Sequence, residues 1–339
     1  MRAAFIDGKE KIEIREAAEP EPHDGEVRVS VDYVGICGSD LHYYFEGANG
    51  EYVVREPLVP GHELSGRVDL DPAGRLAPGT PVTVHPARFG APEHGVEDEP
   101  HLWPGGSYLG SASTWPHTQG GMSERIVVRA DMIRVLPDEL PVRRAVLAEP
   151  LGVALHAATR AGDLAGARVL VSGAGPIGLL ELAAARARGA AHITVSDVLE
   201  APLARASALG ADVVLRAGVD ELPQDAFDVV FECSGAPVAI SSAGRAVRRR
   251  GTVVQVGMVP DESRPVNLAP FISKEVSLLG TFRFKDEIDE AVTLLAARPD
   301  IEQVVTHVLP LHDVVDAFEI AHDSGASGKV VVTLQSDAD

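Results

Sequence analysis

Alternation of apolar and polar residues marks the first 140 or so residues of the chain. Residues 26–32, with the sequence EVRVSVD, alternate at a period of two, and parts of residues 64–70, 81–85 and 125–129 do the same. This period is typical of strands that bury one face. Glycine and proline separate the runs, which favours turns between the strands. The pattern predicts a small, barrel-like β domain.

The pattern changes at about residue 141, where alanine-rich helical stretches begin to alternate with short apolar runs. The apolar runs lie at residues 168–172, 192–196, 212–215, 228–232, 252–256 and 276–279. Strands that alternate with helices predict a doubly wound parallel sheet. Six strands is also the number needed for two mononucleotide-binding halves, so we expect an α/β domain of this kind.

The last 60 or so residues are less regular in pattern. We predict a helix near residues 286–297 and a final strand over residues 329–334. We interpret this tail as a return to the first domain. The predicted organisation is therefore a mostly β domain over residues 1–143, a parallel α/β domain over 144–282, and a return to the β domain over 283–339.

A glycine-rich turn follows the first strand of the predicted parallel sheet, with the sequence VLVSGAGPIG over residues 169–178. Gly173 allows the tight turn, Gly175 the close approach of a pyrophosphate, and Gly178 the close packing of helix on strand. Pro176 stands where the first residue of a helix is expected. Phosphates bound at this turn meet free backbone N–H groups at a helix N-terminus.

Asp197 ends the next predicted strand, 24 residues after Gly173. An acid at this place accepts hydrogen bonds from the ribose of a dinucleotide, and it favours NAD because it repels the 2′-phosphate of NADP. The alternative interpretation is that Asp197 only ends a strand or caps a helix. The glycine turn and the acid together predict a dinucleotide site.

Composition excludes several classes of partner. The chain of 339 residues has a formal net charge of −20, which argues against nucleic acid or an anionic membrane surface. No stretch reaches the length of a membrane span, and the N-terminal residues lack the apolar core of a signal peptide. The two cysteines, Cys37 and Cys233, do not form a disulfide framework, so we expect a cytoplasmic protein.

Three segments rich in glycine or proline carry potential zinc ligands: GICGSDLH at residues 35–42, PGHE at 60–63, and AEP at 148–150. We expect all three to be loops. Zinc binds thiolate, imidazole and carboxylate groups, and a catalytic site keeps one position for water or substrate. Cys37 and His62, with one or two carboxylates, supply that number. Taken singly, Cys37 is also compatible with a small buried hydrophobe and His62 with a core histidine.

The combined motifs GICGSDLH, GHE, SGAGPIGLL, FECSGA and VVQVGM resemble those of the zinc-dependent medium-chain alcohol and polyol dehydrogenases. They occur in the same order and cover nearly the whole chain. The resemblance implies a Rossmann cofactor domain with a six-stranded parallel sheet and a GroES-like catalytic domain formed by the two ends of the chain. The segments GSASTWPH and GTFRF are most similar to the sorbitol and L-idonate 5-dehydrogenase branch.

The resemblance also implies roles for individual residues. Cys37 and His62 match metal ligands, while Glu63 and Glu149 lie beside the metal and either can bind it directly. The other matches are a hydroxyl that relays the substrate proton and a histidine at the outer end of that relay, namely Ser39 and His42. Positions that contact substrate are Tyr43 and Arg283. Positions that contact the cofactor are Ile177, Asp197, Val256, Gly257, Met258 and Phe282.

This sequence departs from the family pattern at two places. Residues 88–108 contain none of the four cysteines that hold a structural zinc in many relatives, so we predict one zinc per chain. An alternative second site, His94 and His101 with Glu97 or Asp98, is better explained as a solvated acidic loop. Some relatives have an arginine five residues after the ribose carboxylate, where this chain has Pro202, and Arg205 is a partial replacement.

The resemblance implies an enzyme that uses zinc and NAD to oxidise a secondary hydroxyl of a sugar acid, with L-idonate and 5-keto-D-gluconate as the expected pair. Arg283 holds the substrate carboxylate, or it binds hydroxyl groups or the cofactor. A neutral polyol such as sorbitol or xylitol is the alternative substrate, and a catalytically silent dinucleotide-binding protein is the alternative outside enzymes. The expected assembly is a homodimer or homotetramer. Trp103 and Trp115 either line the mouth of the site or pack a loop.

Overall fold

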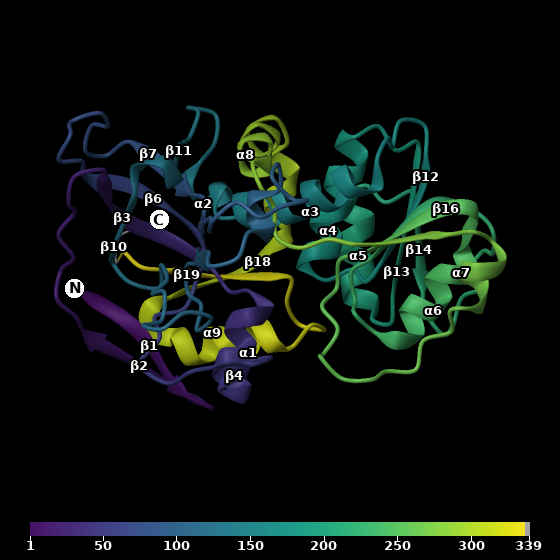
Figure 1. Ribbon diagram of the computed structural model, residues 1–339, viewed down its shortest axis with the longest axis horizontal. Coiled ribbons are helices and arrows are strands. Elements are labelled where there is room, and N and C mark those ends of the chain that lie inside the picture. Colours follow the sequence, from purple (N-terminus) through teal and green to yellow (C-terminus); the bar gives the residue numbers. More distant parts are fainter. Residues whose placement is uncertain (336–339) are drawn as a thin grey trace. The chain divides into compact units, whose positions relative to one another are not determined.

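The structure is a computed structural model that describes residues 1–335 (Figure 1). These residues form two compact units. Unit 1 contains residues 1–149, 291–323 and the chain from residue 329 onward, and unit 2 contains residues 150–290 and 324–328. No helix in the described part of the chain has the length and hydropathy needed to cross a membrane.

A seven-stranded mixed sheet organises unit 1. Its strands are β3 (Glu26–Gly35), β6 (Glu63–Leu70), β7 (Pro81–Val84), β10 (Arg125–Arg129), β11 (Ile133–Val135), β18 (Val305–Pro310) and β19 (Lys329–Thr333). The alternation that predicts β3 is seen in its burial, since Val27, Val29 and Val31 are fully buried while the residues between them are not. From the C-terminal part of the chain, β19 pairs antiparallel with β3, and β18 pairs parallel with β19.

Shorter elements complete unit 1. The short strands are β1 (Arg2–Gly8), β2 (Lys11–Glu16), β4 (Ala48–Asn49), β5 (Tyr52–Val53), β8 (Ala87–Arg88) and β9 (Ser107–Tyr108). The α-helices are α1 (Gly38–Glu46), α2 (Val142–Ala145) and α9 (Val314–His322), and the 3-10 helices are η1 (Pro100–Leu102), η2 (Ala130–Met132), η3 (Pro299–Val304) and η4 (Leu311–Asp313). The mostly β character predicted for this part of the chain is confirmed.

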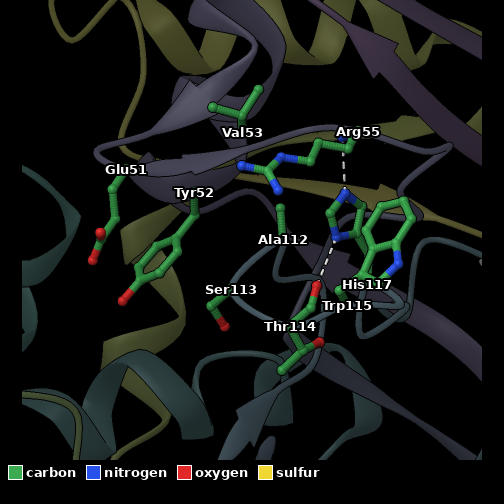
Figure 2. Close-up of a pocket in the computed structure, with 9 residues that line it drawn as sticks. All are labelled: Glu51, Tyr52, Val53, Arg55, Ala112, Ser113, Thr114, Trp115 and His117. Carbon is green, nitrogen blue, oxygen red and sulfur yellow. Dashed lines mark hydrogen bonds between the residues drawn. The ribbon is translucent and has the colours of Figure 1, made fainter.

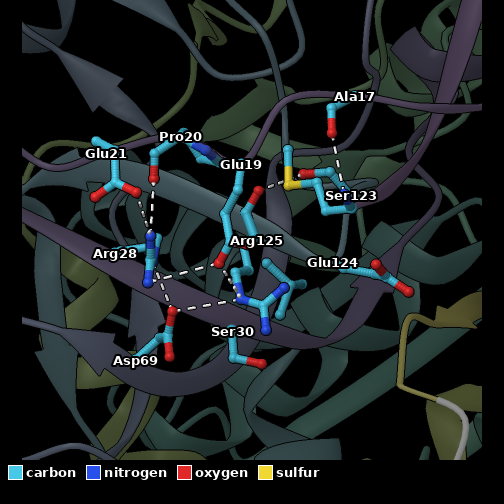
Figure 3. Close-up of polar contacts among 12 residues, drawn as sticks. Ala17, Glu19, Pro20, Glu21, Arg28, Ser30, Asp69, Ser123, Glu124 and Arg125 are labelled. Atoms are coloured by element: carbon cyan, nitrogen blue, oxygen red, sulfur yellow. Dashed lines mark hydrogen bonds and ion pairs between the residues drawn. The ribbon is translucent and has the colours of Figure 1, made fainter.

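Two arginines on neighbouring strands hold the irregular segment before β3 against the sheet (Figure 3). Arg28 on β3 lies 2.6 Å from Asp69 on β6 and within 3.5 Å of both Glu19 and Glu21. Arg125 on β10 lies 3.1 Å from Glu19 and 3.4 Å from Asp69. Most arginines of this acidic chain are paired with carboxylates in this way, as expected from the excess of Asp and Glu.

Unit 2 is built on a parallel sheet of six strands in the order β14-β13-β12-β15-β16-β17. The strands are β12 (Arg168–Ser172), β13 (His192–Asp197), β14 (Val213–Arg216), β15 (Phe227–Glu232), β16 (Val247–Gln255) and β17 (Ser277–Gly280). Four helices follow strands of this sheet: α4 (Pro176–Ala187), α5 (Glu200–Ala208), α6 (Pro237–Ala246) and α7 (Ala269–Ser273). The doubly wound sheet predicted from the sequence is confirmed.

The strand order predicts where a ligand binds in such a sheet. The chain moves outward from β12 to β13 and β14 on one side, and from β15 to β17 on the other. Ligands of doubly wound folds bind at the carboxyl ends of the strands where the order reverses, which here is beside β12. Two further helices, α3 (Ala148–Ala161) and α8 (Glu287–Ala297), lie where the chain passes from one unit to the other.

Glu181 is an unpaired carboxyl group inside α4. Its side chain is fully buried, and neither carboxylate oxygen has a hydrogen-bond partner among residues 1–335. Burial raises the pKa of Glu181 well above its ordinary value of 4.5, because the charged form is not solvated. The folded protein therefore keeps Glu181 protonated. Titration of Glu181 does not lower the free energy of unfolding below pH 4.5, but it lowers this free energy as the pH rises from 4.5 toward the raised pKa.

Replacing Glu181 by leucine is expected to stabilise the protein by about 1–3 kcal/mol, the range for an unpaired buried polar group. The gain is expected to be larger at pH 8 than at pH 5, because only the wild type loses stability as the pH rises. Thermal unfolding midpoints at the two pH values measure this difference. Glu221→Leu, at an exposed position of unit 2, is the control. A gain in stability for Glu181→Leu that is the same at both pH values would contradict a raised pKa for Glu181.

Candidate active site

The three segments with potential metal ligands are not all loops, so this expectation is wrong in part. Cys37 is the N-cap of helix α1, which continues through Glu46. Glu63 is the first residue of strand β6, and Glu149 lies in the first turn of α3. The glycine after Cys37 does not prevent a nine-residue helix. Pro150 occupies a first turn, where its missing N–H costs no hydrogen bond.

Three of the predicted ligands lie together. Ligand atoms of Cys37, His62 and Glu63 are all within 4.8 Å of one another. His62 and Glu63 are buried, and Cys37 is half-buried. Thiolate, imidazole and carboxylate are the donor groups that zinc prefers, and three protein ligands are typical of a catalytic zinc site with one open position.

The Glu63 carboxylate has one oxygen that fits a metal ligand. Glu63 Oε2 is buried and has no hydrogen-bond partner among the described residues. Such an oxygen is costly unless a cation or a donor completes its contacts. Gly35 makes room for it, since a Cβ atom at that position would lie 2.2 Å from Glu63 Oε2. The donor set and the unpaired oxygen together fit a zinc ion bound by Cys37, His62 and Glu63.

The charges around His62 favour a cation at this point. Burial lowers the pKa of His62, but its charge interaction and hydrogen bond with Cys37 and the carboxylates of Asp40 and Glu149 outweigh burial and raise the pKa to about 10. The site therefore has an excess of negative charge that stabilises a positive charge. A divalent metal ion supplies that charge more fully than a proton does.

Lys329 is a residue of the site that the sequence analysis missed. Its Nζ donates to Glu63 Oε1 at 2.6 Å and to the backbone oxygen of Ile36 at 3.0 Å. The exposed fractions are 3% for Lys329 and 1% for Glu63, so the ion pair is buried. The lysine leaves the other carboxylate oxygen for the metal. The available signal was a lysine directly before the apolar run VVV, because buried lysines are nearly always paired.

Asp40 is a second residue whose role was missed, although it lies inside the motif GICGSDLH. Its side chain is fully buried in α1. One carboxylate oxygen accepts the backbone N–H of Cys37 at 3.0 Å, and the other accepts the backbone N–H of Gly61 at 3.0 Å. Burial raises the pKa of Asp40. Because Gly61 precedes His62, one carboxylate fixes the backbone beside both metal-binding residues.

Glu149 lies near this group but is not one of the three residues within 4.8 Å. Its Oε1 accepts a hydrogen bond of 2.6 Å from the hydroxyl of Tyr108, which is also absent from the sequence predictions. The ring of Tyr108 packs edge-on against His62, with 5.3 Å between ring centroids. Burial raises the pKa of Glu149. Direct metal binding by Glu149 stays a prediction.

Three of the residues predicted for proton transfer and substrate contact lie along α1. Ser39 is half-buried in its first turn, while His42 is about half exposed and lies 2.9 Å from Glu46 Oε1. Tyr43 is buried, and its hydroxyl lies 3.3 Å from that of Ser111. Ser39 and His42 thus lie on the same helix, about one turn apart, and a proton relay through them stays a prediction.

The glycine turn in unit 2 has the geometry that its sequence predicts. Strand β12 ends at Ser172 and helix α4 begins at Pro176, with Gly175 as N-cap. Gly173 has a φ of +101°, which a residue with a side chain rarely adopts. A Cβ on Gly178 would lie 1.8 Å from the backbone oxygen of Gly173, whereas nothing lies within 4 Å of a Cβ on Gly175. Gly175 therefore has the open space that the close approach of a phosphate requires.

Asp197 has structural contacts that agree with the alternative interpretation of a strand-end acid. Its two oxygens accept the backbone N–H groups of Ala174, at 2.7 Å, and Leu199, at 2.9 Å. Each carboxylate oxygen can accept a further hydrogen bond, so a role toward a ribose stays a prediction. Arg205 donates to the backbone oxygens of Ser324 and Ser327.

The other predicted cofactor residues lie at or after strand ends of the parallel sheet. Ile177 is half-buried in the first turn of α4, Val256 and Gly257 follow β16, and Met258 is 77% exposed. Phe282 is 44% exposed. Exposed apolar side chains at this edge suit an aromatic cofactor ring.

A buried carboxylate holds the loops beside these residues. Glu232, at the end of β15, accepts the backbone N–H of Gly235 at 2.9 Å and the side-chain amide of Gln255 at 2.7 Å. Its backbone oxygen accepts the N–H groups of Val256 and Gly257, both at 2.8 Å. The motif FECSGA contains this residue, although the sequence alone does not show its contacts.

Arg283 follows Phe282 and stacks on its ring, with the guanidinium carbon 4.7 Å from the ring centroid. The backbone of Arg283 has a φ of +52°, an uncommon conformation for a residue with a side chain. Such a position is often part of a binding site, since strained conformations persist where function requires them.

The segment considered as an alternative second metal site is only in part the solvated loop that we predict. His94 is exposed and lies 2.9 Å from Glu97 Oε1, while His101 is buried and lies 3.6 Å from Glu99. Trp103 packs this loop, with its indole N–H donating to the backbone oxygen of Val96 at 2.8 Å.

Comparison with known proteins agrees with this geometry. Residues 23–138 match the model of the alcohol dehydrogenase GroES-like domain, and residues 176–297 match that of the zinc-binding dehydrogenases. The L-idonate 5-dehydrogenase (NAD(P)(+)) of Escherichia coli K12 is 33% identical over 336 residues, or 97% of each chain. The chain belongs to the zinc-dependent medium-chain alcohol and polyol dehydrogenases.

One further relative and one solved structure place the dehydrogenase within this family. The sorbitol dehydrogenase of Macaca fascicularis is 36% identical over 318 residues, which cover 88% of this chain and 87% of the relative. The crystal structure of L-idonate 5-dehydrogenase from E. coli K-12 superposes with a TM-score of 0.92 at 32% identity, and covers 98% of each chain. The dehydrogenase is therefore a zinc-type oxidoreductase of the polyol and sugar-acid group.

Proposed function

We propose that this dehydrogenase oxidises the C5 hydroxyl of L-idonate to give 5-keto-D-gluconate, with NAD as the hydride acceptor. The observation that carries the proposal is the group of Cys37, His62 and Glu63 with its buried, unpaired Glu63 oxygen. The choice of substrate is supported by the relatives named L-idonate 5-dehydrogenase, and the choice of NAD by Asp197 at the end of β13.

The residues of unit 1 hold the metal and prepare the substrate. Bound zinc supplies a Lewis acid that lowers the pKa of the substrate hydroxyl toward neutrality. Cys37, His62 and Glu63 hold this ion, and Glu149 is the predicted further contact. Ser39 would accept the hydroxyl proton while giving up its own, and the more exposed His42 would release a proton to solvent.

The residues of unit 2 hold the oxidant. NAD supplies the redox chemistry, because its nicotinamide ring accepts the hydride. The free N–H groups at the start of α4 bind the pyrophosphate, with Gly173 and Gly178 shaping the turn. Asp197 accepts hydrogen bonds from the adenosine ribose. Arg283 of this unit and Tyr43 of unit 1 are the predicted substrate contacts.

A substrate panel with the zinc-loaded protein tests this function. We expect NAD reduction at 340 nm to be fastest with L-idonate, slower with sorbitol and xylitol, and weaker with NADP than with NAD for each substrate. A higher kcat/KM for sorbitol than for L-idonate would support the neutral polyol as substrate, which the relatives named sorbitol dehydrogenase favour. No reduction with any polyol or sugar acid would support the silent dinucleotide-binding protein instead.

A further inference from the structure

Unit 1 contains a cavity of about 170 Å³ that is separate from the three predicted metal ligands (Figure 2). One wall is formed by β5 and the residues around it, including Tyr52 and Arg55. The other wall is the loop that contains Ser113, Thr114 and Trp115. None of the residues predicted for the metal, the proton relay or the cofactor lines it.

Arg55 supplies a positive charge to the cavity. Its guanidinium group forms no ion pair or hydrogen bond within residues 1–335, although Arg28 and Arg125 in the same unit each bind carboxylates. Figure 2 shows the Arg55 side chain extending over Ala112, while the carboxylate of Glu51 points away from it. In a chain with a net charge of −20, an arginine without a partner beside a cavity is suited to bind an anion from solution.

Hydroxyl groups line the same cavity. Tyr52, Ser113 and Thr114 contribute side-chain hydroxyls, and that of Ser113 accepts a hydrogen bond of 2.9 Å from the hydroxyl of Ser111. Glu51 adds carboxylate oxygens, which can accept hydrogen bonds from hydroxyl groups of a ligand. This lining suits an open-chain polyol that ends in an anionic group.

His117 fixes the two walls to each other. Its Nε2 accepts the backbone N–H of Arg55 at 3.0 Å, so its Nδ1 carries the proton and donates to the backbone oxygen of Thr114 at 2.9 Å. The backbone N–H of His117 donates to Glu56 Oε1 at 2.6 Å. The histidine is buried. A ligand therefore meets walls whose positions are already set, which reduces the entropy that binding costs.

The cavity is connected to the metal group by two short stretches of the same unit. Tyr108 contacts His62 and lies five residues before Ser113. Tyr43 lies six residues after Cys37, or about 9 Å along α1, and its hydroxyl accepts the backbone N–H of Ala112 at 3.1 Å. These contacts place the Ala112 side of the cavity next to the helix that begins at Cys37.

We propose that this cavity is the subsite for the anionic end of the substrate and that Arg55 binds the carboxylate of a sugar acid. The inference rests on the proposed oxidation of a sugar acid. It also assigns Arg283 to hydroxyl groups or cofactor rather than to the carboxylate.

Tryptophan fluorescence measures binding at the cavity without turnover. Trp115 lines it and is 65% exposed, and the chain has only one other tryptophan, Trp103. In the zinc-loaded protein, we expect Arg55→Gln to weaken L-idonate binding about 10-fold or more, as the loss of a charged hydrogen-bond partner does. Sorbitol has no carboxylate for Arg55 to bind, so its affinity is expected to change less than about 2-fold. Trp115→Phe is expected to remove the fluorescence response.

Matched variants separate charge from fold. Arg88 is an exposed arginine of unit 1 that does not line the cavity, and Arg88→Gln is expected to leave both affinities unchanged. Added salt is expected to weaken L-idonate binding in the wild type and to have little effect in Arg55→Gln. In steady-state assays, Arg55→Gln is expected to raise KM for L-idonate alone, whereas Arg283→Ala lowers kcat/KM for L-idonate and sorbitol equally.

Several results would overturn the subsite. These are an unchanged L-idonate affinity in Arg55→Gln, equal losses for L-idonate and sorbitol in that variant, or a selective loss for L-idonate in Arg283→Ala. A selective loss of a hexitol phosphate in Arg55→Gln, with L-idonate unaffected, would overturn the carboxylate as its ligand. Failure of the proposed function gives a different result, since the wild type would then reduce NAD with no polyol or sugar acid.

Discussion

Replacement of Cys37 by serine is expected to remove zinc from the protein and to abolish polyol oxidation. Cys37 is the single thiolate among the three residues whose ligand atoms lie within 4.8 Å. A serine hydroxyl is a poor zinc ligand at neutral pH because it stays protonated. Loss of a residue that only hydrogen-bonds to a metal ligand typically lowers metal affinity by about 10- to 100-fold. Because Cys37 is itself a predicted ligand, we expect a larger loss of zinc affinity.

Metal analysis after dialysis measures the zinc content, and NAD reduction with the best substrate measures activity. The matched control is Cys233→Ser, which changes the other cysteine of the chain, in the loop after β15. Burial raises the pKa of Cys233 well above its ordinary value, so it is a thiol and not a thiolate ligand. Full zinc content in Cys37→Ser, or loss of zinc in Cys233→Ser, would contradict the assigned ligand group.

Replacement of Lys329 by methionine is expected to cost about 3–5 kcal/mol of stability, the range for breaking a buried ion pair. The change leaves the carboxylate of Glu63 without its partner at 2.6 Å, in surroundings that do not solvate it. Zinc affinity is expected to fall about 10- to 100-fold in addition, because Lys329 orients a ligand. Thermal unfolding of the zinc-free and zinc-loaded forms measures the two effects separately.

A double variant distinguishes these two effects. Lys329→Met with Glu63→Gln removes both charges, so most of the stability is expected to return while zinc binding stays weak. Lys9→Met, at an exposed position of the same unit, is the control for loss of a lysine. If the double variant is no more stable than Lys329→Met alone, the unpaired charge of Glu63 is not the cause of the lost stability.

The regular parts of the fold could be predicted from the sequence because their signals are local. Residues 168–172 and 192–196 are short apolar runs between helical patterns, and the structure has β12 and β13 at these places. The glycine turn could be predicted for the same reason, since Gly173 and Gly178 lie within one turn and its helix. A period of two or of 3.6 is read from neighbouring residues alone.

The contacts of the residues that support the metal site could not be predicted, because they join distant parts of the chain. Lys329 and Glu63 are 266 residues apart, and the pairing of β19 with β3 brings them together. The helix after Cys37 was missed because glycine, serine and aspartate favour turns as often as helix starts. The backbone contacts of Asp40 depend on Gly61, which no periodicity relates to α1.

The place of Lys329 in the chain also sets the order in which the metal site is completed during synthesis. Cys37, His62 and Glu63 emerge from the ribosome early, and at about 5–20 residues per second the lysine follows roughly 10–50 seconds later. Residues 150–290 of unit 2 are synthesised within that interval. The nascent chain can therefore build its nucleotide-binding sheet first, while the Glu63 carboxylate gains its ion-pair partner only when β19 pairs with β3.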